Sequence, residues 1–399
     1  EQKRWDVMIY LDNAATTWPK PPCVTEAVVT ALKKYGANPG RGGHQMSMAA
    51  SREVYLCRET AAKMFHLEDP SRVVFVLNCT MALNMALKGI LASGGRVTVS
   101  DLEHNAVMRP LYAISPGKPV YDIAHVVAGD DDATVENFRR ALTPETKAIV
   151  CTHASNVFGV RLPIRRLGAL AREKGMLFVV DGAQTAGVLP IDMEDCNIDF
   201  LCLAGHKGLY GPMGTGMLLC SGRFDLPTLI EGGTGSQSLL LEQPNDLPDR
   251  LESGTPNTPG ICGLRAGMEW VSARGIENIC RKETRLMALA HDLLTEIPGI
   301  RLYTTRPEEG LCAPVLSLNL EGHCSEELAV ELNRYGVAVR AGLHCAPSAH
   351  RTYGTAPSGT ARLAPSVHTT RQEIEQACRA IRNCAVSGQW GNPPSQWKK

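Results

Sequence analysis

The chain has no surplus of either charge and no long apolar run. Its 399 residues include 41 Lys and Arg and 41 Asp and Glu. A neutral chain offers no electrostatic basis for binding nucleic acid or an anionic membrane. No segment approaches the roughly 20 consecutive apolar residues of a membrane-spanning helix, and the opening EQKRWDVMIY lacks the apolar core of a secretion signal. We therefore predict a cytoplasmic protein without nucleic-acid or membrane partners.

The sequence also lacks any CxxC pair, although it contains fourteen cysteines. They are scattered, and several, such as Cys151, Cys202 and Cys220, lie within apolar segments. Structural zinc sites use closely spaced cysteine pairs, and disulfides persist mainly outside the cytosol. The pattern therefore predicts reduced thiols and no metal site.

Short apolar runs alternate with helical patterns through the first two thirds of the chain. This alternation is typical of parallel α/β layering, and strands that are apolar on both faces fit a sheet covered by helices on each side. The predicted strands are residues 73–77, 97–100, 148–152, 177–181, 200–204 and 216–220, and the predicted helices include 49–65, 81–92 and 164–174.

A polar stretch rich in Gly and Pro, residues 232–260, interrupts this pattern. We expect an α/β protein with a large domain over residues 1–257 and a smaller C-terminal α/β domain over 258–399, with the first residues, to about position 15, packing on the smaller domain. The predicted elements of the smaller domain are a helix over 277–297, a strand over 315–320, a helix over 325–335, two short strands around Arg340 and Arg362, and a last helix near Thr370, where TRQE has the form of a capping box.

Two charged residues follow neighbouring apolar segments. Asp181 ends LFVVD, and Lys207 lies in LAGHKGLYGP after the next segment. A cofactor built on a protonated pyridine ring uses both, because the amine condenses with its aldehyde and the carboxylate keeps the ring nitrogen protonated. Gln184 can donate to the phenolic oxygen of such a cofactor, and His206 can reach its phosphate. Either charged residue alone is typical of a solvated position, but the four together favour a cofactor site.

Further candidates follow other strands. Thr80 begins a helix after the predicted strand 73–77, so its hydroxyl either binds a phosphate at the helix N-terminus or caps the helix. His104 and Asn156 are either ordinary loop residues or cofactor contacts, the histidine by ring stacking and proton transfer.

The last third of the chain adds an arginine and a thiol. Arg362 is suited to hold an amino-acid carboxylate with two parallel hydrogen bonds, although a solvated arginine is commoner, and Arg340 raises the same question. Cys345, in RAGLHCAP, is predicted to lie in a loop, where thiols are less often buried than in strands. A nearby histidine such as His344, or an arginine, would favour the reactive thiolate. Cys345 is therefore the candidate reactive thiol.

In this order, these residues resemble the fold-type I enzymes that bind pyridoxal 5′-phosphate, in the class V aminotransferase superfamily. Within it they resemble the group II cysteine desulfurases and selenocysteine lyases, to which the RxGxHCA segment is specific. The resemblance runs from about Tyr10 to Asn383 and rests on YLDNAATT (10–17), THASNVFG (152–159), DGAQ (181–184), GHKGLYGPMGTG (205–216), LESGTPNTPG (251–260) and RAGLHCAP (340–347).

The resemblance implies a mostly parallel seven-stranded sheet in the large domain and pyridoxal 5′-phosphate on Lys207. It also implies a homodimer, because a residue of the partner subunit would complete the phosphate site. The implied cofactor contacts are Asp181 at the ring nitrogen, His104 on the ring, Asn156 and Gln184 at the phenolic oxygen, and Thr80, Cys79, His206 and the partner's Thr255 at the phosphate. The implied substrate contacts are Arg362, Asn156, Arg340 and His44.

The implied reaction converts L-cysteine to L-alanine and leaves the sulfur on Cys345 as a persulfide, with Lys207 and His104 as the other catalytic residues. The short segment from Arg340 to Arg362 favours hand-over to a small acceptor protein. A selenocysteine lyase, or another class V reaction such as C–S lysis or transamination, remains the alternative. Three positions depart from the family: Ala204 and Cys79 stand where serine and threonine are frequent, and Gly208 is an added glycine.

Overall fold

The computed structural model describes residues 8–40 and 42–387. The chain divides into two compact units. Residues 20–153 and 162–276 form the large unit, and residues 154–161 form the smaller unit with the described parts of 1–19 and 277–399. None of the helices in the described residues combines the length and hydrophobicity that crossing a membrane requires.

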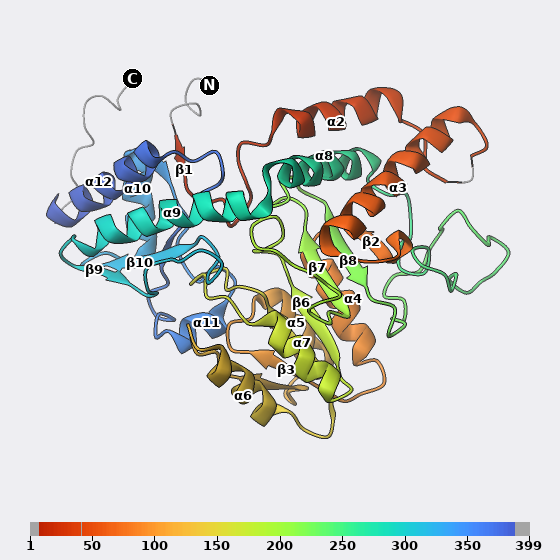
Figure 1. Ribbon diagram of the computed structural model, residues 1–399, viewed down its shortest axis with the longest axis horizontal. Coiled ribbons are helices and arrows are strands. Elements are labelled where there is room, and N and C mark those ends of the chain that lie inside the picture. Colours follow the sequence, from red (N-terminus) through yellow and green to blue (C-terminus); the bar gives the residue numbers. More distant parts are fainter. Residues whose placement is uncertain (1–7, 41, 388–399) are drawn as a thin grey trace. The chain divides into compact units, whose positions relative to one another are not determined.

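A seven-stranded sheet forms the centre of the large unit (Figure 1). The neighbouring strands from β7 to β4 are parallel, whereas β8 is antiparallel to both β7 and β2. This mostly parallel sheet confirms the predicted fold class. The strand order is β2 (Val73–Val76), β8 (Gly216–Cys220), β7 (Phe200–Ala204), β6 (Leu177–Asp181), β5 (Thr146–Thr152), β3 (Arg96–Ser100) and β4 (Tyr121–Ala124).

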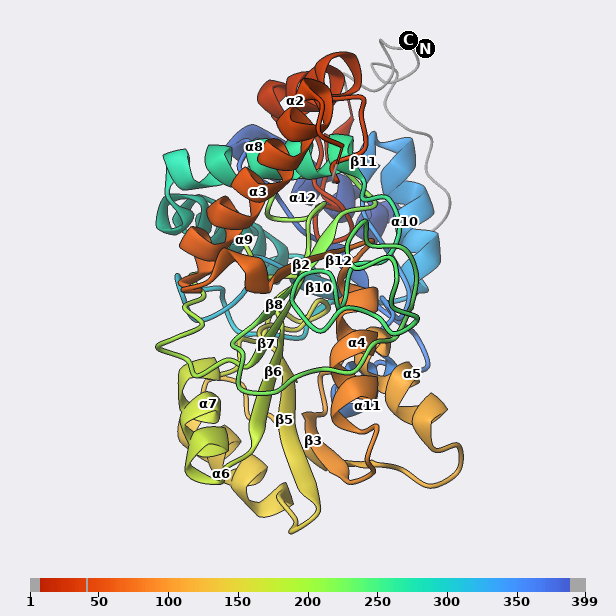
Figure 2. The same ribbon diagram turned by 90° about the vertical axis from the view of Figure 1, so that its right-hand side faces the viewer.

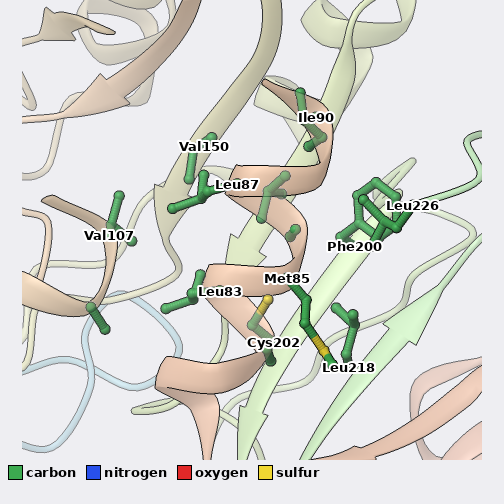
Figure 3. Packing of buried hydrophobic residues seen from close by; sticks show 14 of the residues in the cluster. Leu83, Met85, Leu87, Ile90, Val107, Val150, Phe200, Cys202, Leu218 and Leu226 are labelled. Carbon is green, nitrogen blue, oxygen red and sulfur yellow. The ribbon is translucent and has the colours of Figure 1, made fainter. Parts of the chain in front are cut away.

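Helices cover both faces of this sheet. Figure 2 shows α4 (Cys79–Ile90) and α5 (Asn105–Ile114) on one side and α6 (Asp131–Ala141) and α7 (Ile164–Glu173) on the other. In Figure 3, Leu83, Met85 and Leu87 of α4 lie in a core with Phe200 and Leu218 of the sheet. Burying each such side chain contributes about 1.5–3 kcal/mol. This packing fixes the first turn of α4 at the end of β2.

Three more helices belong to the large unit, in addition to the short 3-10 turn η1 (Pro70–Arg72). In Figure 1, α2 (Pro22–Lys34) and α3 (Gln45–Phe65) lie along α8 (Thr258–Arg274), and both pack against it. The approach is close, because a Cβ at Gly263 of α8 would come within 2.8 Å of Val28 Cγ2.

The smaller unit has its own sheet and core. β10 (Leu316–Leu320) pairs antiparallel with β9 (Ile300–Leu302) and β12 (Ala361–Leu363), and β1 (Ile9–Tyr10) pairs parallel with β11 (Val337–Ala338). Its helices are α9 (Ile276–Thr295), α10 (Ser325–Arg334), α11 (Pro347–Thr352) and α12 (Arg371–Ser387). The predicted capping box before α12 is confirmed, since Thr370 N donates to Glu373 Oε2 (2.7 Å) and Glu373 N donates to Thr370 Oγ1 (3.2 Å).

The elements differ from the predicted ones at a few places. All six predicted strands of the large sheet are present, but β4 is an additional edge strand whose YDIA sequence is only partly apolar. Arg362 lies in β12, whereas Arg340 forms only an isolated bridge with Arg362. The predicted division at residue 257 also differs from the observed grouping, because α8 packs within the large unit and residues 154–161 join the smaller one. The Gly- and Pro-rich stretch is a loop as far as Asn257, where α8 follows, and it is not a boundary between the units.

Candidate active site

Asp181 and Lys207 lie at the carboxyl ends of neighbouring strands in the large unit. β6 ends at Asp181, and its parallel neighbour β7 ends at Ala204, shortly before Lys207. Thr80 and His104 follow β2 and β3, which run in the same direction. The large unit therefore brings four predicted residues to one edge of the sheet, where open α/β sheets bind their ligands.

Asp181 is buried, with 5% of its surface exposed. Its Oδ1 accepts hydrogen bonds from Ala183 N (2.9 Å) and from the Cys79 thiol (Sγ to Oδ1, 3.4 Å). Burial, and then the charge of Asp181, raise the pKa of Cys79 well above its ordinary value. The thiol therefore stays protonated and donates. The family resemblance assigns Cys79 to the cofactor phosphate, whereas its side chain bonds the carboxylate.

The loop that carries Lys207 is held by its neighbours. Lys20 Nζ donates to the carbonyl of His206 (2.7 Å), and burial lowers the pKa of Lys20 to about 8. Burial, and then the charges of Lys207 and Lys20, lower the pKa of His206 to about 4, so its imidazole is neutral at pH 7. The added glycine has a steric reason, because a Cβ at Gly208 would lie 2.4 Å from Ala186 O.

His104 and the residue before it are both fixed by hydrogen bonds. His104 caps α5, with Nδ1 accepting from Ala106 N (3.0 Å), which leaves the imidazole proton on Nε2. Glu103 is fully buried, and its Oε1 accepts from Thr152 N (2.9 Å) and from the Ser100 hydroxyl. Burial raises the pKa of Glu103 to about 8. Glu103 is not among the predicted site residues, although its position directly before the candidate His104 could have identified it from the sequence.

The start of α4 resolves the two interpretations of Thr80 in part. Asn78 is the residue that caps the helix, since its Oδ1 accepts from Met81 N (3.0 Å). Thr80 is exposed in the first turn. Thr255 is also exposed, and it lines a cavity of about 240 Å³ with Met81, Gly216 and other residues of the large unit.

Two other predicted residues of the large unit are less closely tied to the sheet edge. His44 is exposed and caps α3, with Nδ1 accepting from Ser47 N (3.3 Å). Gln184 is partly buried in the turn after β6.

Arg362 is the most deeply buried charged residue of the smaller unit's candidates, with 2% of its surface exposed. Its Nη1 donates to Asn156 O (2.8 Å) and its Nη2 donates to Asp12 Oδ1 (2.9 Å). Burial lowers the pKa of Arg362, and Asp12 acts against that shift. The buried Nε has no hydrogen-bond partner among the described residues. The guanidinium therefore keeps a donor for a further acceptor, such as a carboxylate. Asp12 lies in the quoted YLDNAATT motif but was assigned no role.

Cys345 lies in a bend built from left-handed residues. His344 has φ 47° and Cys345 has φ 57°, a conformation that costs about 1–3 kcal/mol for each non-glycine residue. The carbonyl of His344 accepts from Asn156 Nδ2 (2.7 Å). Cys345 is exposed, whereas the His344 side chain is buried. The side chain of Arg340 is also exposed, and its carbonyl accepts from Arg362 N (2.8 Å).

The structure corrects one expectation about His344. Burial, and then the charge of Arg362, lower the pKa of His344 to about 3, so the imidazole is neutral at pH 7. It therefore supplies no positive charge to favour the thiolate of Cys345. The smaller unit thus brings together Arg362, Asn156 and the Cys345 bend. Asp12 is a partner that the sequence analysis gave no role, and His344 takes part as a neutral residue rather than as the predicted source of positive charge.

Comparisons with known proteins match the chain along nearly its whole length. The model of the aminotransferase class-V family matches residues 9–377. A cysteine desulfurase of Pectobacterium atrosepticum is 32% identical over 386 residues, which cover 94% of this chain and 92% of that protein. A probable cysteine desulfurase of Xylella fastidiosa is 32% identical over 382 residues, covering 94% and 90%.

Solved structures show the same likeness. The apo structure of a cysteine desulfurase from Thermococcus onnurineus superposes with a TM-score of 0.88 at 28% identity, covering 96% of both chains. The Escherichia coli cysteine desulfurase CsdA superposes with a TM-score of 0.83 at 26% identity, covering 96% of this chain and 95% of that one. From the family match, which spans nearly the whole sequence, the chain belongs to the class-V aminotransferase family.

Proposed function

We propose that the protein is a cysteine desulfurase that uses pyridoxal 5′-phosphate, takes sulfur from L-cysteine onto Cys345 and releases L-alanine. The relatives named cysteine desulfurase cover nearly all of the chain and support this proposal. The observation that carries it is the Cys345 bend. Cys345 is exposed, and Asn156 contacts both its neighbour His344 and the buried guanidinium of Arg362.

The residues of the sheet edge fit the cofactor. Asp181 is a buried acid at a strand end, which is the kind of partner that keeps a pyridine nitrogen protonated. Lys207, in the next strand's loop, would form the covalent link. Thr80 and the neutral His206 would donate to the phosphate, and Gln184 and Asn156 to the phenolic oxygen. The free N–H groups at the start of α4 favour an anion there.

When bound, the cofactor supplies a sink for the electron pair left after the Cα proton of cysteine is removed. Arg362 would hold the substrate carboxylate, with Asn156, and with Arg340 and His44 as further contacts. The amine of Lys207 would take the Cα proton. The Cys345 thiolate would then attack the substrate sulfur, so that an S–S bond forms, the Cβ–S bond breaks, and its electron pair stays on Cβ. Protonation of that carbon gives alanine, and His104, whose Nε2 carries a proton, would move protons near the ring.

Burial separates Cys345 from most other thiols of the chain. All fourteen cysteines lie in the described residues and are free, and only Cys324 and Cys345 are exposed. Cys324 caps α10, where its Sγ accepts from Glu327 N (3.4 Å). Cys345 has no such bond to a helix and follows the residue bonded to Asn156, which favours it as the sulfur acceptor.

Three further proposals concern the protein's surroundings. We infer a homodimer in which the partner's Thr255 completes the phosphate site, because Thr255 is exposed in this chain. We infer a small acceptor protein, because the segment between Arg340 and Arg362 is held by backbone bonds at both ends and does not form a long swinging loop. The fourteen free thiols support a cytoplasmic location.

The test is sulfur transfer with purified holoenzyme and L-cysteine. We expect alanine as the product and a mass increase of one sulfur atom on the peptide that contains Cys345. Cys345→Ala should bind cofactor and cysteine but form no persulfide, whereas the matched variant Cys324→Ala should behave like the wild type. Normal desulfuration by Cys345→Ala, or sulfur found on Cys324, would contradict the proposal.

The same assay separates the alternatives. Retained activity of Cys345→Ala toward L-selenocysteine, with its activity toward L-cysteine lost, would indicate a selenocysteine lyase. Pyruvate in place of alanine would indicate C–S lysis.

A further inference from the structure

The bend at Cys345 places two neighbouring side chains in opposite environments. His344 and Cys345 are consecutive left-handed residues, and neither is glycine. His344 is 5% exposed, while Cys345 is exposed. A conformation that both residues disfavour persists only where the surroundings hold it. The contacts of His344 show what holds this one.

The imidazole of His344 is bonded to Thr360, the residue just before the strand that carries Arg362. Its Nε2 lies 2.9 Å from Thr360 O, and a carbonyl oxygen can only accept, so Nε2 carries the proton. The backbones of Gly342 and Thr360 exchange two hydrogen bonds (3.2 and 3.1 Å). The two backbone segments lie very close together, because a Cβ at Gly359 would lie 2.7 Å from Gly342 Cα. The segment before the thiol is therefore anchored through both backbone and side chain.

The other ring nitrogen shows that His344 is not a proton carrier in this arrangement. Its Nδ1 is buried and has no hydrogen-bond partner among the described residues. The charged and titratable groups that face the ring are Arg362, Arg340 and His350, whose imidazole stacks at 5.8 Å between centroids. A proton added at Nδ1 would find no acceptor there and would meet two guanidinium charges. The ring acts as a neutral anchor.

We propose that His344 is a positioning residue that holds the Cys345 thiol outward: its Nε2–H is fixed to Thr360 O and its carbonyl to Asn156, so the left-handed bend cannot relax. The proposal rests on the proposed function, in which Cys345 accepts sulfur. Because Asn156 also accepts from Arg362, the bend and the substrate-binding arginine share one hydrogen-bonded chain. Loss of the anchor would slow the attack of the thiol more than it weakens cysteine binding.

A matched pair of variants tests this in the holoenzyme. His344→Gln keeps a donor at a similar reach, and His344→Phe keeps a planar ring without a donor. His350→Phe is the control, because it removes a second buried imidazole that makes no bond to the bend; its Nδ1 bonds Thr355 Oγ1 (2.7 Å). Three quantities are measured. They are the rate of single-turnover persulfide formation on Cys345, the affinity for cysteine from the spectral change on binding, and the rate of Cys345 alkylation, located by peptide mapping.

We expect His344→Phe to lower persulfide formation and Cys345 alkylation about tenfold, the equivalent of one lost hydrogen bond. Cysteine binding should stay within about twofold, and His344→Gln should recover most of the loss. The proposal is overturned if His344→Phe loses thermal stability but keeps wild-type alkylation and persulfide rates, or if His350→Phe falls as far. Alkylation needs no turnover. If the wild type forms no persulfide, the proposed function fails while the alkylation ratio still decides the role of His344.

Discussion

Two regions of the molecule hold their candidate residues by different means. One is the sheet edge, the carboxyl ends of the large unit's strands with Thr80, His104, Asp181 and Lys207. The other is the thiol bend, His344 and Cys345 of the smaller unit. At the sheet edge, Asp181 ends a strand, and Thr80, His104 and Lys207 each follow one within a few residues, so the pairing of the strands places all four. At the bend, Cys345 is placed by hydrogen bonds from segments far apart in the sequence, through Asn156 and Thr360. Strand pairing alone positions the residues of the sheet edge, whereas hydrogen bonds must hold the strained backbone of the thiol bend in place.

The two regions also differ in what burial does to their thiols. Burial, and then the charge of Asp181, raise the pKa of Cys79 and of Cys202 well above the ordinary value. Burial and the charge of Glu103 do the same for Cys151. Thiols at the sheet edge therefore stay protonated and unreactive. Among the thiols near the candidate residues, Cys345 is the exposed one, so exposure decides which of them can attack.

The largest expected effect is that of Lys207→Ala. Removal of the amine should abolish the absorbance of the lysine-linked cofactor and lower alanine formation by about a thousandfold or more, because catalytic groups that act as a set fail together. The alkylation rate of Cys345 should not change, since the bend is held within the smaller unit. Lys33→Ala, at an exposed position of α2, is the control. A lysine-linked cofactor that survives Lys207→Ala would reject the assignment, and slower alkylation would break the independence of the two regions.

The next largest effect is expected for Asp181→Asn. The amide keeps the shape but removes the charge, and a hydrogen bond to a charged group is worth about 1.5–3 kcal/mol. This loss corresponds to about ten- to a hundredfold in kcat/KM for L-cysteine, while the cofactor remains attached to Lys207. Asp195→Asn, at an exposed position, should leave kcat/KM unchanged. An unaltered kcat/KM in Asp181→Asn would show that the sheet edge does not depend on this charge.

Asp12→Ala tests how much the ion pair with Arg362 stabilises the smaller unit. The guanidinium of Arg362 is buried, and removal of its carboxylate partner leaves that charge uncompensated. We expect the free energy of unfolding to fall by about 2 kcal/mol, less than for a fully buried pair because the Asp12 side chain is partly exposed. Urea denaturation measures the change. Asp292→Ala breaks the exposed pair with Arg306 in the same unit and should cost less than about 1 kcal/mol. Equal losses in the two variants would contradict the argument.

The same contrast explains what the sequence could predict. The apolar strands, the lysine and the acid were predictable because strand period and chain order place residues at a sheet edge without knowledge of distant contacts. The exception, β4, is an edge strand and carries little of the apolar signal. The domain division was less predictable, since composition marks the loop before α8 and not the packing of α8 on α2 and α3.

The position of the thiol bend could be predicted from the sequence, but its contacts could not. RAGLHCAP indicated a loop with a candidate thiol, and the adjacent histidine suggested an imidazolium beside it. Only the three-dimensional contacts show that His344 turns inward, that Asn156 holds its carbonyl and that Asp12 pairs with Arg362. Such hydrogen bonds between distant segments leave no periodic signal, and partners such as Glu103 and Asp12 look like ordinary acids in the sequence.

The smallest expected effect concerns Glu103 and depends on pH. Burial raises the pKa of Glu103 from its ordinary 4.5 to about 8, so between these values the native chain keeps a proton that the unfolded chain has released. The unfolded state then binds fewer protons, and stability falls as pH rises through this window. Relative to Glu103→Gln, which cannot titrate, the wild type should lose about 1 kcal/mol of stability between pH 6.5 and 7.5. Urea denaturation of both proteins at each pH measures the difference.

Glu173→Gln is the matched control, because the Arg139 ion pair lowers the pKa of Glu173 to about 2 and the contribution of Glu173 to stability is constant between pH 6.5 and 7.5. Parallel pH curves for the wild type and Glu103→Gln would mean that Glu103 is ionised in its buried site, and the sheet edge would then carry a second negative charge beside Asp181.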